Sequence, residues 1–321
     1  MLNDRKIIMC LTPLQMLIAE KIIEKDPMSK FDIVVSILND NEKYKLYSER
    51  LVSKAENFLI FKPKESKGKP LLMALDVLRF SKQLKEAKFK KIYAEYYLAS
   101  CDYRYFQYIV NSRAMDGKIF TFDDGTANIY KKSLYFSNSK PRWINRFFWR
   151  FFGIKEYMAE IFSKSFKHYT IYRNFENVIK NIEVIDLFNL EHESGKREEE
   201  INIFLGQPFG DFGFPIEHKY LEDVLKKLKI DFYFKHPREI ELFDVPYIET
   251  SLIFEDYVID FLRERADTKI NLYTFTSSAA LNVLDISGVN VFFLKNKLFE
   301  QNMFEFYEML EENSVKVLSI P

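Results

Sequence analysis

Residues 231–239 read DFYFKHPRE, and residues 270–278 read INLYTFTSS. Each stretch begins as a short apolar run, the pattern of a buried strand, and each ends in polar residues. The first run ends at His236 and Pro237, and the second ends at a serine pair. In open α/β sheets, ligands bind in the crevice outside the carboxyl ends of the strands. The two stretches therefore predict a parallel sheet with a ligand site at its carboxyl edge.

The titratable side chain in this pattern is His236. A histidine ring can hold or release a proton near neutral pH, because its reference pKa is about 6.5. Pro237 biases His236 toward an extended backbone, which would present the ring at the end of the strand. Ser277 and Ser278 precede an apolar helical pattern. They can hold an anion such as a phosphate at the start of that helix, or simply cap it. An ordinary surface or core role is the competing interpretation for His236.

Strand and helix patterns alternate along most of the chain. The alternation stops at residues 190–200, LEHESGKREEE, which are polar and charged, and it restarts at residue 201. Such alternation predicts βαβ units and parallel sheets covered by helices. The expected fold class is therefore α/β, with two Rossmann-like parallel-sheet domains facing a cleft. We place the N-terminal domain at 1–190, the linker at 190–200 and the C-terminal domain at 201–321.

The amino-acid composition argues against several classes of protein. The 321 residues include 47 basic and 47 acidic side chains, so the net charge is zero. A general nucleic-acid binder would show a basic excess, and this class is disfavoured. Cys10 and Cys101 are predicted to be buried free thiols in a reducing cytosol. The sequence has no zinc-type ligand spacing and no run of eighteen apolar residues, so we expect neither a metal site nor a membrane span.

Aspartates follow predicted strands in two further segments. Asp211 lies in the glycine-rich loop GQPFGDFGF at 206–214, where the backbone can approach a ligand closely. Asp123 and Asp124 precede Gly125 at the end of a strand in the first half. Either place could supply a general base. Ordinary turns are the alternative at both, because Asp and Gly favour turns.

The segment 141–155, PRWINRFFWRFFGIK, differs from its surroundings. Arg142, Arg146 and Arg150 recur every four residues and would share a helix face, with aromatic residues between them. A basic, aromatic helix of this kind fits the surface of an anionic membrane. A contact with a second subunit or between domains fits nearly as well.

Several short motifs, taken in order, resemble one known family. They are CLTPLQMLIAEKII at 10–23, FDDGT at 122–126, LGQP at 205–208, KHPRE at 235–239 and the serine pair at 277–278. With these motifs the chain resembles the bacterial sialyltransferases of glycosyltransferase family 52. That family includes lipooligosaccharide and capsule α-2,3-sialyltransferases.

The resemblance implies a GT-B-like fold with CMP-sialic acid bound in the C-terminal half. It implies inversion at the anomeric carbon in one displacement, without a required metal or other cofactor. His236 would be the general acid for the departing CMP phosphate, which Ser277 and Ser278 would hold. The base would be Asp211, with Asp124 or Asp123 as the alternative. The other positions expected to contact substrate are Gly125, Gly206, Gln207, Pro237 and Thr276.

The expected partners are CMP-sialic acid and a terminal galactoside of a bacterial surface glycan, with α-2,3 linkage. We expect a cytoplasmic protein, with peripheral association at the inner membrane and a homodimer as further expectations. Two alternatives stay open at this point. One is another GT-B glycosyltransferase with a different nucleotide sugar, and the other is a non-catalytic, membrane-associated scaffold.

Overall fold

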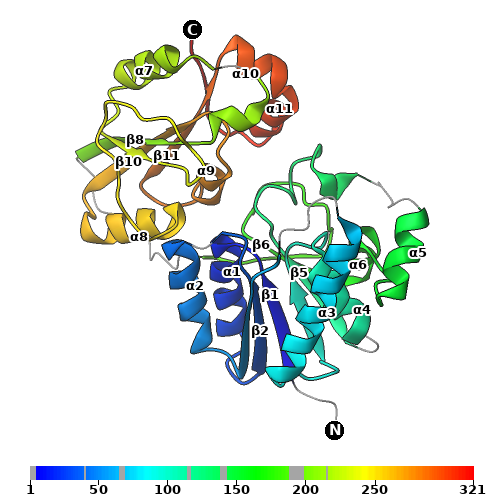
Figure 1. The fold of residues 1–321 in the computed structure, drawn as a ribbon. Helices are drawn as coiled ribbons and strands as arrows, with labels where there is room; N and C mark the ends of the chain where they lie inside the picture. The colour runs from blue at the N-terminus through cyan, green and yellow to red at the C-terminus, as the bar shows by residue number, and fades with distance from the viewer. Residues whose placement is uncertain are drawn as a thin grey trace. The chain divides into compact units, whose positions relative to one another are not determined.

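The chain folds into two compact units, Met1–Leu187 and Phe188–Pro321. Figure 1 shows each unit as a sheet covered by helices. The predicted linker at 190–200 lies mostly outside the described residues, and its last two residues, Glu199 and Glu200, already belong to a strand. The computed structural model describes residues 5–39, 41–64, 69–113, 117–137, 143–187, 199–214 and 216–321.

The N-terminal unit is built on one all-parallel sheet. Its elements in chain order are β1 (Arg5–Cys10), α1 (Pro13–Glu24), β2 (Lys30–Ser36), α2 (Glu42–Val52), β3 (Asn57–Phe61), α3 (Pro70–Glu86), β4 (Glu95–Leu98), α4 (Arg104–Arg113), β5 (Lys118–Phe122), η1 (Leu134–Phe136), α5 (Trp143–Phe151), α6 (Met158–Lys164), β6 (Ser165–Thr170) and β7 (Ile182–Val184). The strand order is β3-β2-β1-β4-β5-β6-β7, and each neighbouring pair is parallel. This is the order of the dinucleotide-binding fold, with a seventh strand added at one edge.

The C-terminal unit has a second parallel sheet. Its elements are β8 (Glu199–Leu205), η2 (Phe209–Phe212), α7 (His218–Lys227), β9 (Phe232–Phe234), α8 (Phe254–Glu264), β10 (Thr268–Thr274), α9 (Ser278–Asn282), β11 (Val289–Lys295), α10 (Lys297–Asn302), α11 (Phe304–Glu312) and β12 (Val317–Ser319). The strand order is β12-β11-β10-β8-β9. Numbered within the unit, this is the flavodoxin-like order 2-1-3-4-5.

The central strands explain why the parallel arrangement could be predicted. In β1, Ile7, Ile8, Met9 and Cys10 are all fully buried, as expected for a strand covered on both faces. The α1 helix follows at once, because Thr12 accepts a hydrogen bond from the backbone N–H of Gln15 at 3.3 Å. The predicted fold class, two parallel-sheet α/β domains, is confirmed.

Each sheet has a topological switch point, where the strand order reverses direction. In the N-terminal unit it lies between β1 and β4, and in the C-terminal unit between β8 and β10. Loops after neighbouring strands diverge there, which opens a crevice for ligands. The side chains that follow these four strands are therefore the first place to look for a site.

Candidate functional site

The ends of β8 and β10 are joined by the side chain of Gln207. Its Oε1 accepts a hydrogen bond from the backbone N–H of Thr276 at 2.9 Å, and Gln207 is only 3% exposed. A backbone N–H can only donate, so this bond identifies the amide oxygen. The amide nitrogen Nε2 has no hydrogen-bond partner among the described residues. A buried donor without a partner is costly, and a bound polar ligand would satisfy it.

The serine pair begins α9, as predicted, but the helix is short. Ser277 is its N-cap, and the side chain of Ser277 makes no capping hydrogen bond. The backbone N–H of Ser277 instead donates to Thr274 Oγ1 at 3.4 Å. Because α9 has only 5 residues, its dipole offers little to an anion. The start of α9 therefore offers hydroxyl and N–H groups as its donors, at the half-buried Ser277 and the exposed Ser278.

His236 lies directly beyond the end of β9, in a tight turn. The turn closes where the backbone N–H of Glu239 donates to the carbonyl of His236 at 3.0 Å, with Pro237 and Arg238 between them. The ring nitrogen Nδ1 of His236 accepts from the backbone N–H of Arg238 at 3.1 Å. Since β9 pairs with β8 and β8 pairs with β10, the axes of β9 and β10 lie about 10 Å apart. The loop at Gly206 lies between the two.

Beneath the turn is a buried carboxyl group whose role we did not predict. Glu239 is 4% exposed, its Oε1 accepts from the hydroxyl of Tyr233 at 2.5 Å, and its Oε2 accepts from the backbone N–H of His236 at 3.2 Å. Burial raises the pKa of Glu239 to about 7. In the motif KHPRE, Glu239 follows His236 by three residues, a spacing that is typical of a turn. This spacing is the feature of the sequence from which a contact of Glu239 with His236 could have been predicted.

Gly206 lies where a side chain would collide with the residues beneath the His236 turn. A Cβ atom on Gly206 would lie 2.3 Å from Oε2 of Glu239 and 2.7 Å from the ring of Tyr233. The predicted close approach at the start of this loop is therefore to the protein's own side chains, which support the His236 turn.

Asp211 lies in η2 and is connected to the same turn. Its carboxylate forms an ion pair with Arg238 at 2.7 Å, and both side chains are more than half exposed. The backbone N–H of Asp211 bonds to the carbonyl of Pro208 at 2.9 Å. Phe209 packs against Phe275 with the ring centroids 6.1 Å apart. These contacts place an accessible carboxylate beside the loop that carries His236.

Asp124 is part of a polar cluster at the switch point of the N-terminal sheet. Gln15 donates to Ser100 Oγ at 2.9 Å and to Asp124 Oδ1 at 2.6 Å. The hydroxyl of Tyr135 donates to Asp124 Oδ2 at 2.5 Å. Burial, followed by the negative charge of Asp124, raises the pKa of the nearby Asp102. Gln15 and Tyr135 were not predicted here, although Gln15 belongs to the quoted motif at 10–23.

Asp123 has a different environment from its neighbour. It is completely buried, and its Oδ1 lies 2.9 Å from His168 Nε2. Its Oδ2 accepts from the hydroxyl of Thr170 at 2.8 Å and the backbone N–H of Ile171 at 2.6 Å. The carboxylate joins the end of β5 to β6, so its position is that of a structural group and does not suit a base for an incoming acceptor. Gly125 follows with φ of +57°, which suits glycine.

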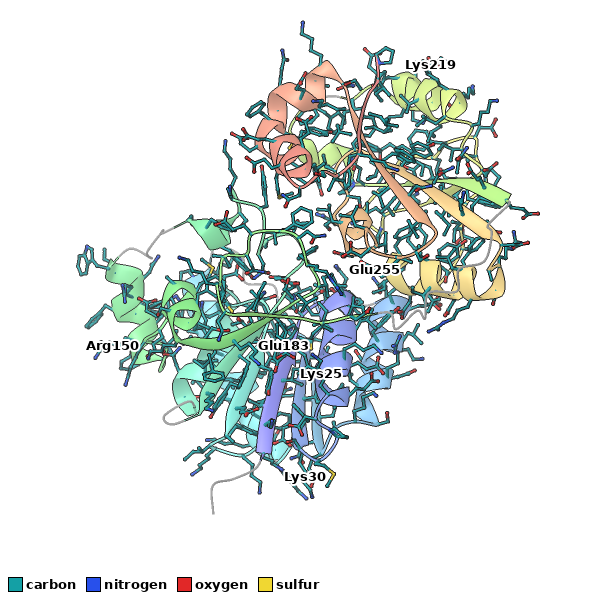
Figure 2. The ribbon with its side chains drawn as sticks, turned by 180° about the vertical axis from the view of Figure 1, so that it is seen from behind. Lys25, Lys30, Arg150, Glu183, Lys219 and Glu255 are labelled. Carbon is teal, nitrogen blue, oxygen red and sulfur yellow. The ribbon has the colours of Figure 1, made fainter. Side chains whose placement is uncertain are left out.

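The basic, aromatic segment forms α5, which lies at the outer edge of the N-terminal unit (Figure 1). Trp149 points inward and is 5% exposed. The opposite face is apolar yet exposed, with Trp143 at 78%, Ile144 at 59%, Phe147 at 75% and Phe151 at 86%. Arg150, seven residues after Trp143, shares this side of the helix and extends outward (Figure 2). We call these five residues, Trp143, Ile144, Phe147, Arg150 and Phe151, the α5 surface.

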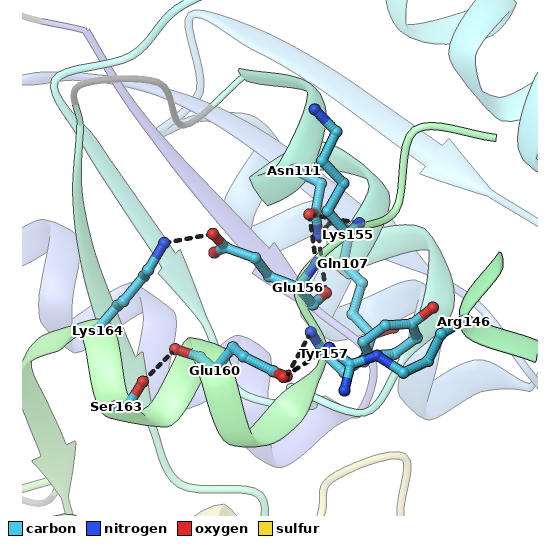
Figure 3. A network of polar contacts seen from close by, with 9 residues as sticks. All are labelled: Gln107, Asn111, Arg146, Lys155, Glu156, Tyr157, Glu160, Ser163 and Lys164. Atoms are coloured by element: carbon cyan, nitrogen blue, oxygen red, sulfur yellow. Dashed lines mark hydrogen bonds and ion pairs between the residues drawn. The ribbon is translucent and has the colours of Figure 1, made fainter. Parts of the chain in front are cut away.

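A polar network holds α5 and the following chain in place (Figure 3). Arg146 forms an ion pair with Glu160 at 3.1 Å, and Glu160 also accepts from the backbone N–H of Tyr157 at 3.1 Å. Asn111 of α4 accepts from the backbone N–H of Glu156 at 2.7 Å and donates to its carbonyl at 2.9 Å. The ion pair of Arg146 and the buried Trp149 therefore connect the helix that carries the α5 surface to the rest of the unit. Arg142, predicted to share its basic face, lies outside the described residues.

Comparison with known proteins identifies the family. The sequence model of Glycosyltransferase family 52 matches residues 29–298. A protein of Pasteurella multocida (strain Pm70) named CMP-N-acetylneuraminate:beta-galactoside alpha-2,3-sialyltransferase is 32% identical over 320 residues, 98% of this chain and 99% of its own. An N-acetyllactosaminide alpha-2,3-sialyltransferase of Haemophilus influenzae (strain ATCC 51907 / DSM 11121 / KW20 / Rd) is 32% identical over 298 residues, 91% of this chain and 92% of its own.

Solved structures agree on the fold. The calicheamicin glycosyltransferase CalG4 superposes with a TM-score of 0.52 at 10% identity, covering 99% of this chain and 86% of its own. A UDP-glucosyltransferase from Polygonum tinctorium gives 0.52 at 11% identity, with the same coverage of both chains. These likenesses show a GT-B-like fold and nothing about substrate. The chain belongs to glycosyltransferase family 52.

Proposed function

We propose that this protein transfers sialic acid from CMP-sialic acid to a terminal galactoside, forming an α-2,3 linkage with inversion. The names of the Pasteurella and Haemophilus relatives support the donor, acceptor and linkage. The observation that carries the proposal is at the carboxyl edge of the C-terminal sheet. There, three adjacent strands bring to one edge His236, the hydroxyl of Ser277 and the amide nitrogen of Gln207, which has no hydrogen-bond partner among the described residues.

In this proposal the donor phosphate lies at that edge. When the bond between the anomeric carbon and the phosphate oxygen breaks, negative charge develops on CMP. Fixed hydrogen-bond donors stabilise such charge without reorganising during the reaction. His236, Gln207, Ser277 and Ser278 would supply these donors, with Thr276 holding the Gln207 amide in place. No metal is required in this scheme, because the donors act on the leaving group directly.

The acceptor hydroxyl needs a carboxylate base, because its own pKa is far too high for it to ionise unaided. We propose Asp211 for this role, supported by its exposure and its ion pair with the His236 turn. Asp124 already accepts bonds from Gln15 and Tyr135 on separate oxygens, which suits a group that orients the acceptor. Gly125 would allow the sugar to approach this loop.

The choice of base can be tested with Asp211→Asn and Asp124→Asn. We expect Asp211→Asn to lower kcat for transfer to lactose by about 10²–10⁴-fold, the usual effect of removing a general base. Asp124→Asn should mainly raise KM for the acceptor. Asp260→Asn is the matched control, because Asp260 is also exposed and paired with an arginine, Arg263. Full activity in Asp211→Asn together with a kcat loss in Asp124→Asn would move the base to the N-terminal unit.

We further propose that the protein works at the cytoplasmic face of the inner membrane, with the α5 surface against anionic lipid. In the part of the chain that the structure describes, no helix is long and apolar enough to cross a bilayer. The α5 surface differs from a membrane-spanning helix, because its exposed aromatic side chains lie on one side of a short helix with Arg150 beside them. Such a helix lies in the interface, where its rings enter the lipid and its cations meet the headgroups.

Flotation with vesicles tests the membrane proposal. We expect the protein to float with vesicles rich in phosphatidylglycerol, since anionic lipid attracts the cationic residues. With vesicles of pure phosphatidylcholine, the protein should remain in the bottom fraction. The double variant Phe147→Ser/Phe151→Ser should lower binding at least about a hundredfold, because each buried aromatic ring contributes about 1.5–3 kcal/mol and every 1.4 kcal/mol is about tenfold. Phe304→Ser is the control, since Phe304 is an exposed phenylalanine of the other unit.

Two results would overturn the membrane proposal. One is flotation of the double variant at the level of the unchanged protein. The other is a homodimer in solution that the same double substitution dissociates, which would assign the α5 surface to a second copy of the chain.

A further inference from the structure

The guanidinium of Arg104, the first residue of α4, packs against aromatic rings. Its central carbon lies 4.8 Å from the ring centre of Trp149 and 5.2 Å from that of Tyr157. Its Nη1 donates to Gln107 Oε1 at 2.7 Å, while its buried Nε has no hydrogen-bond partner among the described residues. Nε and Nη2 form one edge of a guanidinium, and such an edge binds two oxygens of a phosphate or carboxylate at once. Arg104 therefore lacks an acceptor at an edge that suits an anion.

The charge of Arg104 is only weakly compensated. Burial lowers the pKa of Arg104. Among the described residues, the carboxylate that opposes this effect is Asp102, and it acts through space rather than through an ion pair. A buried charge is costly unless it is paired and hydrogen-bonded. An anion bound beside Arg104 would lower this cost.

Tyr157 places a second donor without a partner beside Arg104. The side chain is 4% exposed, and its hydroxyl has no hydrogen-bond partner among the residues that the structure describes. Arg146 also lies over this ring, with 5.4 Å between its central guanidinium carbon and the ring centre (Figure 3). Burial raises the pKa of Tyr157, while the charges of Arg104 and Arg146 oppose that rise. The hydroxyl is thus a proton donor close to two cations.

We propose that Arg104, Tyr157 and Arg146 form a binding site for a phosphate group. A phosphate offers several oxygens, so one can accept from Tyr157 while others accept from the Nε edge of Arg104. Arg146 is already paired with Glu160 at 3.1 Å, and it would contribute mainly its positive charge. These residues belong to the N-terminal unit, whereas the proposed donor site is built from the C-terminal unit. The inference goes beyond the proposed sialyl transfer and does not depend on it.

Two sources of phosphate fit this position. Arg146 lies three residues after Trp143 and three before Trp149, so it stands on the helix between the exposed α5 surface and the buried side. A phospholipid whose acyl chains contact the α5 surface would bring its headgroup phosphate there. A soluble phosphate compound would use the same donors without a membrane. The ligand chemistry is the same in both cases, and probes with and without lipid separate the two sources.

Fluorescence of Trp149 reports on the site, because Arg104 stacks on its ring. The chain has two tryptophans, so Trp143→Phe leaves Trp149 as the remaining one. The full-length Trp143→Phe protein is titrated at constant ionic strength with inorganic phosphate, with glycerol 3-phosphate and with phosphatidylglycerol vesicles. We expect a saturable change in Trp149 emission. A response to the soluble probes would show that free phosphate suffices, and a response to vesicles alone would assign the site to a lipid headgroup.

Substitutions within the site make the titration specific. Added to Trp143→Phe, either Tyr157→Phe or Arg104→Gln should weaken the apparent affinity at least about tenfold, as expected for a lost hydrogen bond to a charged group. Lys155→Gln is the matched control, because it removes an exposed positive charge two residues from Tyr157 and should leave the affinity unchanged. An unchanged affinity in Tyr157→Phe would overturn the inference, and so would a Trp149 emission that none of the three probes alters.

The thermal stability of Tyr157→Phe gives an independent test. Removing a buried donor that has no partner relieves an unfavourable contribution, whereas removing a hydrogen-bonded hydroxyl destabilises the fold. In phosphate-free buffer we expect the Tm of Tyr157→Phe to equal or exceed that of the unchanged protein. The variant should gain less Tm than the unchanged protein when the phosphate probe is added, since it binds the probe more weakly. A lower Tm in phosphate-free buffer would show that the hydroxyl already has a partner in the protein, and the inference would then fail.

Discussion

Replacing His236 with alanine is expected to lower kcat/KM for transfer from CMP-sialic acid to lactose by about 10²–10³-fold. The removed ring is, in our account, a donor to the charge that develops on the departing phosphate, and losses of this size follow removal of such donors. The ring is half-buried and lies in a loop, so the fold should persist. The measurement is initial-rate kinetics with both substrates varied.

His218→Ala is the control for this prediction. His218 belongs to the same unit, stacks on Phe243 with 4.8 Å between ring centroids, and has no proposed part in the reaction. Rates close to those of the unchanged protein in His236→Ala would remove the histidine from the chemistry. Thermal shifts with CMP, UDP and GDP should accompany the kinetics. Stabilisation by UDP or GDP in place of CMP would favour the alternative of a different nucleotide sugar.

Gly206→Ala is expected to produce the largest loss of stability among conservative changes near the site. The new methyl group would lie 2.3 Å from Oε2 of Glu239 and 2.9 Å from the hydroxyl of Tyr233, distances that real Cβ atoms do not show. The buried carboxyl must then shift, and its bond to the N–H of His236 would be strained. Overpacking of this kind costs about 1–3 kcal/mol. We expect the free energy of unfolding and kcat/KM to fall together.

Gly210→Ala is the matched control in the same loop. A Cβ on Gly210 would have no heavy atom within 4 Å, and its backbone does not adopt a positive φ angle. Its stability should change by less than about 0.5 kcal/mol, as for surface substitutions in general. Denaturant unfolding of both variants checks this. Equal stability of Gly206→Ala and Gly210→Ala would show that the contacts around Glu239 are not tight, and would contradict its support of the His236 turn.

Much of the architecture follows from local patterns in the sequence. Apolar runs such as β1 and β10 are buried, and each is followed by a helix, so parallel sheets could be predicted. The strands β6 and β7 were not predicted, because β6 buries only His168 and Thr170 and β7 has no fully buried residue. The pairing of β6 with β5 joins segments distant in the chain, and β7 in turn pairs with β6.

The residues of the candidate site also fall into those that local sequence predicts and those that it does not. His236, Ser277 and Asp211 follow strands or lie in a glycine-rich loop, and local sequence identifies such positions. The pair formed by Asp123 and His168 joins residues 45 positions apart, and no spacing rule brings them together. The buried position of Glu239 likewise depends on Tyr233 and on the missing side chain of Gly206. Long-range packing, which one sequence does not display, decides these environments.

A crystal structure of the protein with CMP bound tests the central claim most directly. Our account predicts a phosphate oxygen within hydrogen-bond distance of His236 Nε2 and of the hydroxyl of Ser277 or Ser278, with the Gln207 amide nitrogen donating to the same nucleotide. A nucleotide bound elsewhere, or a His236 ring turned away from its phosphate, would contradict it.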